Sequence, residues 1–213
     1  MIERVEWLAL EVKYLDEARE FYEGVLGLEA SDVSEREARY PLPSDAELVL
    51  RAPGAVPRGG VHVHYALSAP EHEIPRWRER LDSEGLWTQT EEFGGATSLY
   101  FYDVDGHCVE LAGVADGDAA VEGFYEVVLE VEDLDAYVAD LVSRGAEEVD
   151  CESDRVRLNA GAIDIEVWRP RLGLADGQGG VHVDLGVVCE GRPPDDAVEV
   201  ERGYRRRDEE GHH

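Results

Sequence analysis

The chain of 213 residues has little positive charge, few cysteines and no long apolar segment. It carries 20 lysines and arginines against 49 aspartates and glutamates, for a formal net charge of −29, and Lys13 is its single lysine. Nucleic acids and anionic membrane surfaces repel such a charge, so we expect neither as a partner. No apolar run could span a bilayer, and the N-terminal residues lack the apolar core of a signal peptide. We therefore expect a soluble, cytoplasmic protein.

The cysteines and the distribution of acid support the same expectation. Cys108, Cys151 and Cys189 lie far apart without CxxC spacing, which is typical of a reducing compartment. The acidic residues are spread along the whole chain instead of forming a tail. A dispersed acidic shell with almost no lysine resembles the proteins of salt-loving (haloarchaeal) organisms, where concentrated salt screens the self-repulsion.

The chain repeats one order of elements: a strand, a helix and three strands. In the first copy the strand Val5–Val12 precedes a helix with Ala18, Phe21, Tyr22 and Val25 on one apolar face. The second and third copies begin at the strands Val61–Leu67 and Phe124–Val131. The glycines that end the three helices recur about 60 residues apart, at Gly27, Gly85 and Gly145.

A further echo marks the start of a fourth copy. The segment Gly59-Gly-Val-His-Val-His64 returns as Gly179-Gly-Val-His-Val-Asp184, but the pattern stops after this strand. The sequence thus predicts an α+β fold of repeated βαβββ modules. Residues 1–115 would hold two paired modules, residues 122–190 a third module with the first strand of a truncated fourth, and residues 191–213 a charged, flexible tail.

Two strands carry polar residues that suggest chemistry. Asp105-Gly106 is a strong hairpin signal, and the return strand places Glu110 among apolar neighbours. Such a carboxylate is either a residue on a solvated face or a ligand or base inside a cavity. His62 and His64 share one face of their strand, and a buried histidine there is equally consistent with the core.

Three segments resemble the vicinal oxygen chelate superfamily of glyoxalases, bleomycin resistance proteins and extradiol dioxygenases. They are Leu15–Leu28, His64–Leu67 and Asp103–Leu111. The resemblance implies a cup of two modules around a divalent metal, Fe²⁺, Mn²⁺, Ni²⁺ or Zn²⁺. The metal would act as a Lewis acid on a small-molecule substrate with adjacent oxygens. A lyase, isomerase, transferase or ring-cleaving dioxygenase would fit.

The resemblance also implies a set of metal ligands. The matching positions are His64 on the fifth strand, Glu110 on the eighth and Glu47 on the fourth, with Glu110 and Glu47 as candidate catalytic residues. The first-strand position, usually histidine, holds Trp7, whose indole N–H cannot bind a metal. His62 lies roughly 6–7 Å along the strand from His64, which is long for joint coordination.

Four residues are then expected to line the substrate pocket: Trp7, His62, Tyr100 and Tyr102. The alternative function is a metal-free binding or scaffold protein in which Trp7 fills the vacated ligand space. We expect the C-terminal half to be structural, because Asp184 replaces the histidine and no Glu-Leu pair ends the third module. The incomplete fourth module leaves an open sheet edge, so we expect a homodimer.

Overall fold

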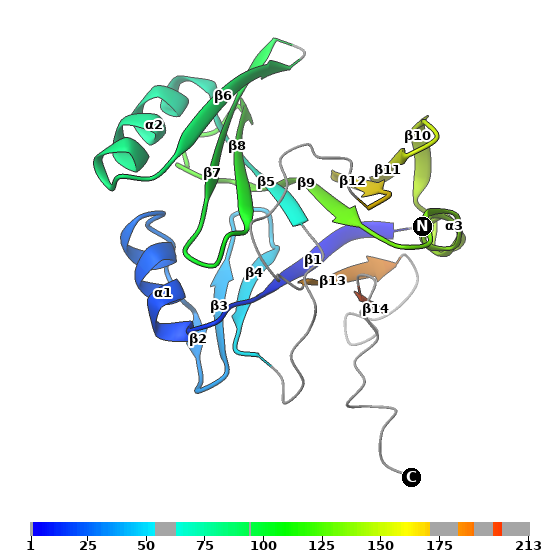
Figure 1. Ribbon diagram of the computed structural model, residues 1–213, viewed down its shortest axis with the longest axis horizontal. Helices are drawn as coiled ribbons and strands as arrows, with labels where there is room; N and C mark the ends of the chain where they lie inside the picture. The colour runs from blue at the N-terminus through cyan, green and yellow to red at the C-terminus, as the bar shows by residue number, and fades with distance from the viewer. Residues whose placement is uncertain (1, 54–62, 94, 171–182, 190–197, 202–213) are drawn as a thin grey trace.

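The computed structural model describes residues 2–53, 63–93, 95–170, 183–189 and 198–201, which form two mixed sheets and three α-helices (Figure 1). The helices are α1 (Leu15–Gly24), α2 (Ile74–Ser83) and α3 (Leu134–Ser143), and a 3₁₀ turn (Glu71–Glu73) precedes α2. The strands of the first repeat are β1 (Ile2–Glu11), β2 (Asp32–Val33), β3 (Glu37–Pro41) and β4 (Glu47–Arg51). Those of the second are β5 (Val63–Pro70), β6 (Thr88–Phe93), β7 (Ala96–Tyr102) and β8 (Cys108–Ala115). The third has β9 (Gly123–Glu130), β10 (Glu147–Cys151), β11 (Arg155–Ala160) and β12 (Ile163–Trp168), followed by β13 (Val183–Cys189) and β14 (Val198–Glu201).

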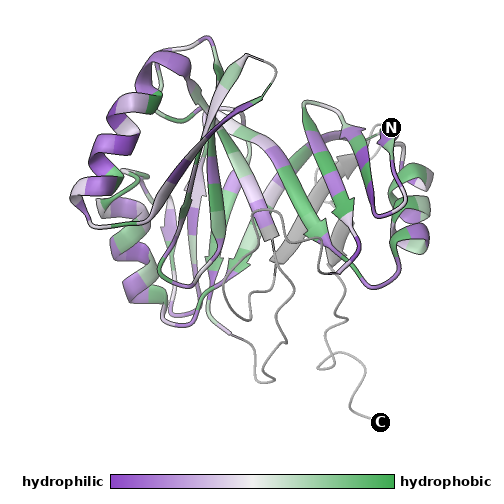
Figure 2. Cartoon of the chain, turned by 45° about the horizontal axis from the view of Figure 1, so that its top comes forward, coloured by the Kyte–Doolittle hydropathy of each residue, from purple (hydrophilic) through white to green (hydrophobic). Residues whose placement is uncertain are grey.

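Each helix packs one apolar face on the core; α1 and α2 turn a polar face outward, whereas α3 is apolar over most of its surface (Figure 2). The buried residues are Ala18, Phe21 and Tyr22 in α1, Ile74, Trp77 and Leu81 in α2, and Leu134, Val138 and Leu141 in α3. They lie three or four residues apart, the spacing of one helix face. The glycines that follow the helices, Gly27, Gly85 and Gly145, all have positive φ, as expected of residues that end a helix. Among the described residues, no helix is long and apolar enough to cross a membrane.

Both sheets follow from the repeated order of elements. The first and last strands of each repeat are parallel neighbours: β1 with β4, β5 with β8, and β9 with β12. The six-stranded sheet has the order β14-β13-β1-β4-β3-β2, and the eight-stranded sheet has the order β10-β11-β12-β9-β5-β8-β7-β6. An α+β fold with mixed sheets is therefore confirmed.

The structure corrects the predicted pairing of the repeats. Strand β5 pairs with β9, so the eight-stranded sheet joins the second repeat to the third. The first repeat pairs through β1 with β13 and not with the second repeat. All these first strands share the same apolar pattern, so local sequence does not determine which two of them pair. Residues 1–115 thus do not form the expected two-module cup.

The C-terminal segment also differs from expectation. Residues 191–213 were expected to be a tail, but β14 within them pairs antiparallel with β13. Strand β13 covers the edge of the first repeat, and β14 extends the sheet beyond it. The homodimer expected from the truncated fourth module stays a prediction.

One glycine marks a close contact between the third repeat and the first. Gly161, in the turn between β11 and β12, has a φ of 72°, and a Cβ there would lie 2.1 Å from the carbonyl oxygen of Glu3. Gly161→Ala is expected to lower the free energy of unfolding by about 3 kcal/mol, because strain adds to the clash. Gly85→Ala is the control, since it has similar φ with nothing within 4 Å and is expected to cost about 1–2 kcal/mol. Equal losses in denaturant titrations would show that the contact is not tight.

Candidate metal centre

The eight-stranded sheet surrounds a cavity of about 910 Å³. Alternate residues of its strands face this space, as the two-residue period of a strand requires. The predicted residues His64, Tyr100, Tyr102 and Glu110 all line it. A cavity of this volume suits a small-molecule ligand.

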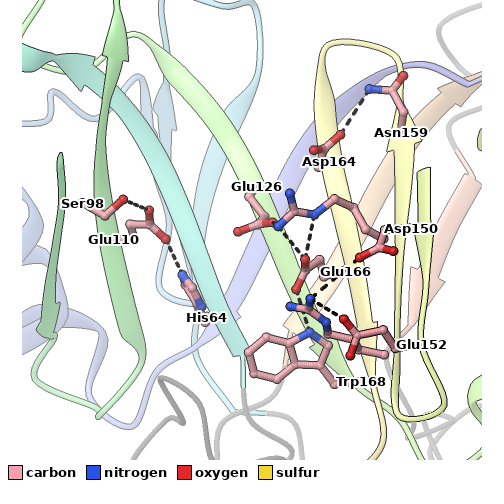
Figure 3. Close-up of polar contacts among 12 residues, drawn as sticks. His64, Ser98, Glu110, Glu126, Asp150, Glu152, Asn159, Asp164, Glu166 and Trp168 are labelled. Carbon is pink, nitrogen blue, oxygen red and sulfur yellow. Dashed lines mark hydrogen bonds and ion pairs between the residues drawn. The ribbon is translucent and has the colours of Figure 1, made fainter. Parts of the chain in front are cut away.

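Three buried donors from three strands converge in the cavity wall. His64 on β5, Glu110 on β8 and Glu126 on β9 each offer one ligand atom, and these atoms lie within 4.8 Å of one another. The His64 Nε2 lies 2.6 Å from Glu110 Oε2, and the Ser98 hydroxyl donates to Glu110 Oε1 at 2.6 Å (Figure 3). The Nδ1 atom of His64 is buried without a hydrogen-bond partner among the described residues.

The strand register explains why Glu126 joins the group. In the β5–β9 pair, Ala66 faces Glu126 and His64 faces Val128. Glu126 is therefore the third repeat's counterpart of His64. Each lies one residue before the facing pair Tyr65 and Val127, at the centre of the β5–β9 ladder. It holds the first-strand ligand position that the sequence analysis assigned to Trp7.

The two carboxyl groups of the centre have opposite electrostatic environments. Burial raises the pKa of Glu110, but the hydrogen bond and charge of His64, with hydrogen bonds from Ser98 and Tyr100, bring it below its usual value. Burial and the charge of Glu166 raise the pKa of Glu126 to about 7, against the opposing effect of His64. The surroundings of Glu126 thus favour its neutral form, whereas those of Glu110 favour its charged form.

A third buried carboxylate, Glu166 on β12, lies in the same cavity. Arg157 on β11 contacts Glu166 Oε1 through Nη2 at 2.6 Å and Nε at 2.7 Å, and its Nη2 lies 3.3 Å from Glu126. The indole of Trp168 donates to Glu166 Oε2 at 2.7 Å. Figure 3 shows Glu126, Glu166 and Trp168 together on the side of the site opposite Glu110.

The remaining predicted residues lie elsewhere. Glu47 is on β4 of the six-stranded sheet, where its Oε2 accepts a hydrogen bond from Arg39 at 2.9 Å. Trp7 on β1 is half-buried with the Arg51 guanidinium 5.5 Å from its ring. Neither is among the described residues that line the cavity. His62 lies outside the described residues.

Sequence reasoning missed Glu126 and Glu166, which the third repeat contributes. Glu126 is the single charged residue of Phe124–Leu129, whereas Glu166 shares Ile163–Trp168 with a second acid, Asp164. The resemblance of Phe124–Val131 to Leu8–Val12 aligns Glu126 with Trp7, and this is the sequence signal that could have found it. The third repeat thus contributes side chains to the cavity wall, in addition to the structural role expected of the C-terminal half.

Comparison with known proteins agrees with this architecture. Residues 4–160 match the family model of the Glyoxalase/Bleomycin resistance protein/Dioxygenase superfamily. The chain belongs to this superfamily. The search of curated protein sequences found no match to this chain.

Comparison with solved structures also gives matches to this chain. A putative dioxygenase from Bacillus subtilis strain 168 shares 21% identity over 85% of this chain and 69% of its own, with a TM-score of 0.66. Lactoylglutathione lyase from Agrobacterium tumefaciens shares 23% identity over 51% of this chain and 92% of its own, with a TM-score of 0.44. The fosfomycin resistance protein FosX from Listeria monocytogenes, solved with Mn(II) and sulfate, shares 23% identity over 55% and 94%, with a TM-score of 0.45.

Proposed function

We propose that this superfamily member is a divalent-metal-dependent enzyme that acts on a small molecule with adjacent oxygen atoms. The observation that supports this most is the convergence of His64, Glu110 and Glu126 within 4.8 Å in a cavity wall. Two carboxylates that are both buried and close together repel each other and have lost their hydration, so a cation would stabilise them.

The donor set fits a divalent transition metal. One imidazole and two carboxylates suit Mn²⁺, Fe²⁺, Ni²⁺ or Zn²⁺. His64 has a buried Nδ1 atom without a partner among the described residues, and Glu126 has a pKa raised to about 7 by burial and the charge of Glu166. When bound, such a metal supplies Lewis-acid stabilisation of negative charge that develops on the substrate's oxygens.

The chain's own residues would orient the ligands and the substrate. The Ser98 hydroxyl holds Glu110 by a hydrogen bond of 2.6 Å, which fixes the direction of its carboxylate. Trp87 and Tyr102 stack with ring centroids 5.3 Å apart at the cavity, and Phe93 and Tyr125 add exposed aromatic surface there. This lining suits a substrate with a planar apolar part beside its oxygens. A lyase, isomerase, transferase or ring-cleaving dioxygenase reaction remains consistent with it.

The metal-free alternative depended on Trp7 in place of a ligand. Trp7 belongs to the six-stranded sheet and does not line the cavity, so that reason no longer applies. Glu126 at the corresponding position supports the metal-dependent function instead.

Metal analysis tests the proposal. Protein purified without an affinity tag, in high salt because of its net charge, is expected to hold close to one equivalent of divalent metal after saturation and dialysis. The double variant His64→Ala/Glu110→Ala is expected to retain none while its circular dichroism spectrum is unchanged. A folded wild-type protein that binds no metal at saturating supply would refute the metal-dependent enzyme.

A further inference from the structure

The strand register gives the candidate centre a fourth ligand position, and Glu166 occupies it. In the second repeat, Glu110 faces Ala66, two residues after His64. In the third repeat, Glu166 faces Val128, two residues after Glu126. Glu166 is therefore the counterpart of Glu110, and the strand register alone would make it a fourth ligand.

Glu166 is nevertheless not among the described residues that converge as donors. Both of its carboxylate oxygens already have partners: Oε1 accepts from Arg157 at 2.6 and 2.7 Å, and Oε2 accepts from the Trp168 indole at 2.7 Å. Its side chain is only 4% exposed, so these partners act at short range with little screening by water. They hold the carboxylate and neutralise its charge.

In the second repeat, the residues around Glu110 differ from those at the corresponding positions around Glu166. Tyr100 faces Glu110 across β7 and β8, whereas Arg157 faces Glu166 across β11 and β12. Two residues beyond each glutamate, Ala112 in β8 corresponds to Trp168 in β12. Glu110 thus has neutral hydroxyl donors and stays available to a cation, while Glu166 has a guanidinium and an indole.

We infer that Arg157 and Trp168 are positioning residues that withhold Glu166 from the metal. The centre is then left with three protein ligands and open positions for the substrate's adjacent oxygens. Catalytic zinc sites keep such an open position, whereas structural zinc sites hold four protein ligands. This inference rests on the proposed metal-dependent function.

The first test is the affinity of the apoprotein for Mn²⁺, measured by isothermal titration calorimetry. Arg157→Met frees Glu166 and is expected to tighten Mn²⁺ binding about tenfold. Arg157→Met/Glu166→Gln is expected to lose this gain, because no carboxylate remains to act as a fourth ligand. Trp168→Phe removes the donor to Oε2 alone and is expected to give a smaller gain with Arg157 still in place.

Arg155→Met is the matched control. Arg155 lies on the same strand and lines the same cavity, but its guanidinium donates a hydrogen bond to Glu152 at 2.8 Å. Its loss removes the same positive charge without release of Glu166, so a much smaller gain is expected. The visible absorption of bound Co²⁺ gives a second readout, since an added ligand changes its intensity.

Each outcome decides the inference. An equal gain in Arg155→Met, a gain that persists without Glu166, or unchanged affinity in both Arg157→Met and Trp168→Phe would overturn it. If the wild-type protein binds Mn²⁺ and any of these results is found, the inference falls and the proposed function stands. If neither the wild-type protein nor Arg157→Met binds Mn²⁺, both fall.

Discussion

Glu126→Gln is expected to weaken metal binding by about 100-fold, at the upper end of effects typical of metal sites, while Glu47→Gln leaves it unchanged. The amide keeps the size of the carboxyl group but removes the charge that a cation needs. Glu126 lies with His64 and Glu110 within 4.8 Å, whereas Glu47 is bonded to Arg39 on the other sheet. Calorimetric titration of both variants with Mn²⁺ checks the prediction.

The control variant makes the result informative. Both changes remove one negative charge, so a general effect of net charge would appear equally in each. If Glu47→Gln weakens binding and Glu126→Gln does not, the first repeat holds the metal and the centre described above is wrong. Thermal unfolding of each apoprotein should first show that both variants fold.

Glu47 shows why a ligand position cannot be assigned from the number of its strand in the family pattern alone. In the first repeat, Glu47 faces Trp7, just as Cys108 faces His64 in the second. The position equivalent to Glu110 is therefore Val49, which faces Ala9. The first repeat thus has no metal-binding side chain at either of the two positions, since Trp7 corresponds to His64 and Val49 to Glu110.

His64 and Glu110 could be predicted because their signals are local. A turn at Asp105-Gly106 fixes which residues of the return strand share a face, and the echo of Gly59–His64 marks a first strand. The α+β fold also followed from local signals, since helix periodicity and helix-ending glycines depend on near neighbours. Glu126 depends instead on the pairing of β5 with β9, a long-range choice that apolar alternation leaves open.

A buried polar cluster behind the candidate centre links α1 to the eight-stranded sheet. Asp103 accepts hydrogen bonds from Tyr22 of α1 at 2.8 Å and from the backbone N–H of His107 at 2.8 Å, and its Oδ2 lies 2.7 Å from His107 Nδ1. The Tyr22 hydroxyl also lies 2.9 Å from that of Tyr65, the neighbour of His64 on β5. The sequence analysis did not anticipate this cluster, because its members are distant along the chain.

Asp103→Asn is expected to lower the free energy of unfolding by about 3–5 kcal/mol, since it leaves a buried, hydrogen-bonded ion pair without its anion. Such a loss is a large fraction of the stability of a typical domain. Chemical denaturation measures it, with Asp118→Asn as the control because that aspartate is exposed. A loss below about 1 kcal/mol would mean that the pair contributes little, as exposed pairs do.

The loss should also depend on pH in a defined direction. Burial raises the pKa of Asp103, but the charge and hydrogen bonds of His107 bring it below its usual value. Burial lowers the pKa of His107, but the charge and hydrogen bond of Asp103, with the charge of Asp105, together raise that pKa above its usual value. The contribution of Asp103 is thus complete above its unfolded pKa of about 4 and is lost as pH falls through the lower folded value.

The contribution of His107 has the opposite sign. It is complete below the unfolded pKa of about 6.5 and is lost as pH rises through the higher folded value. The difference in unfolding free energy between wild type and Asp103→Asn is therefore expected to be largest between about pH 4 and 6.5 and to shrink on either side. Denaturation curves from pH 3 to 9 at constant salt measure this profile. A difference that stays constant across the range would show that Asp103 and His107 are not an ionised pair.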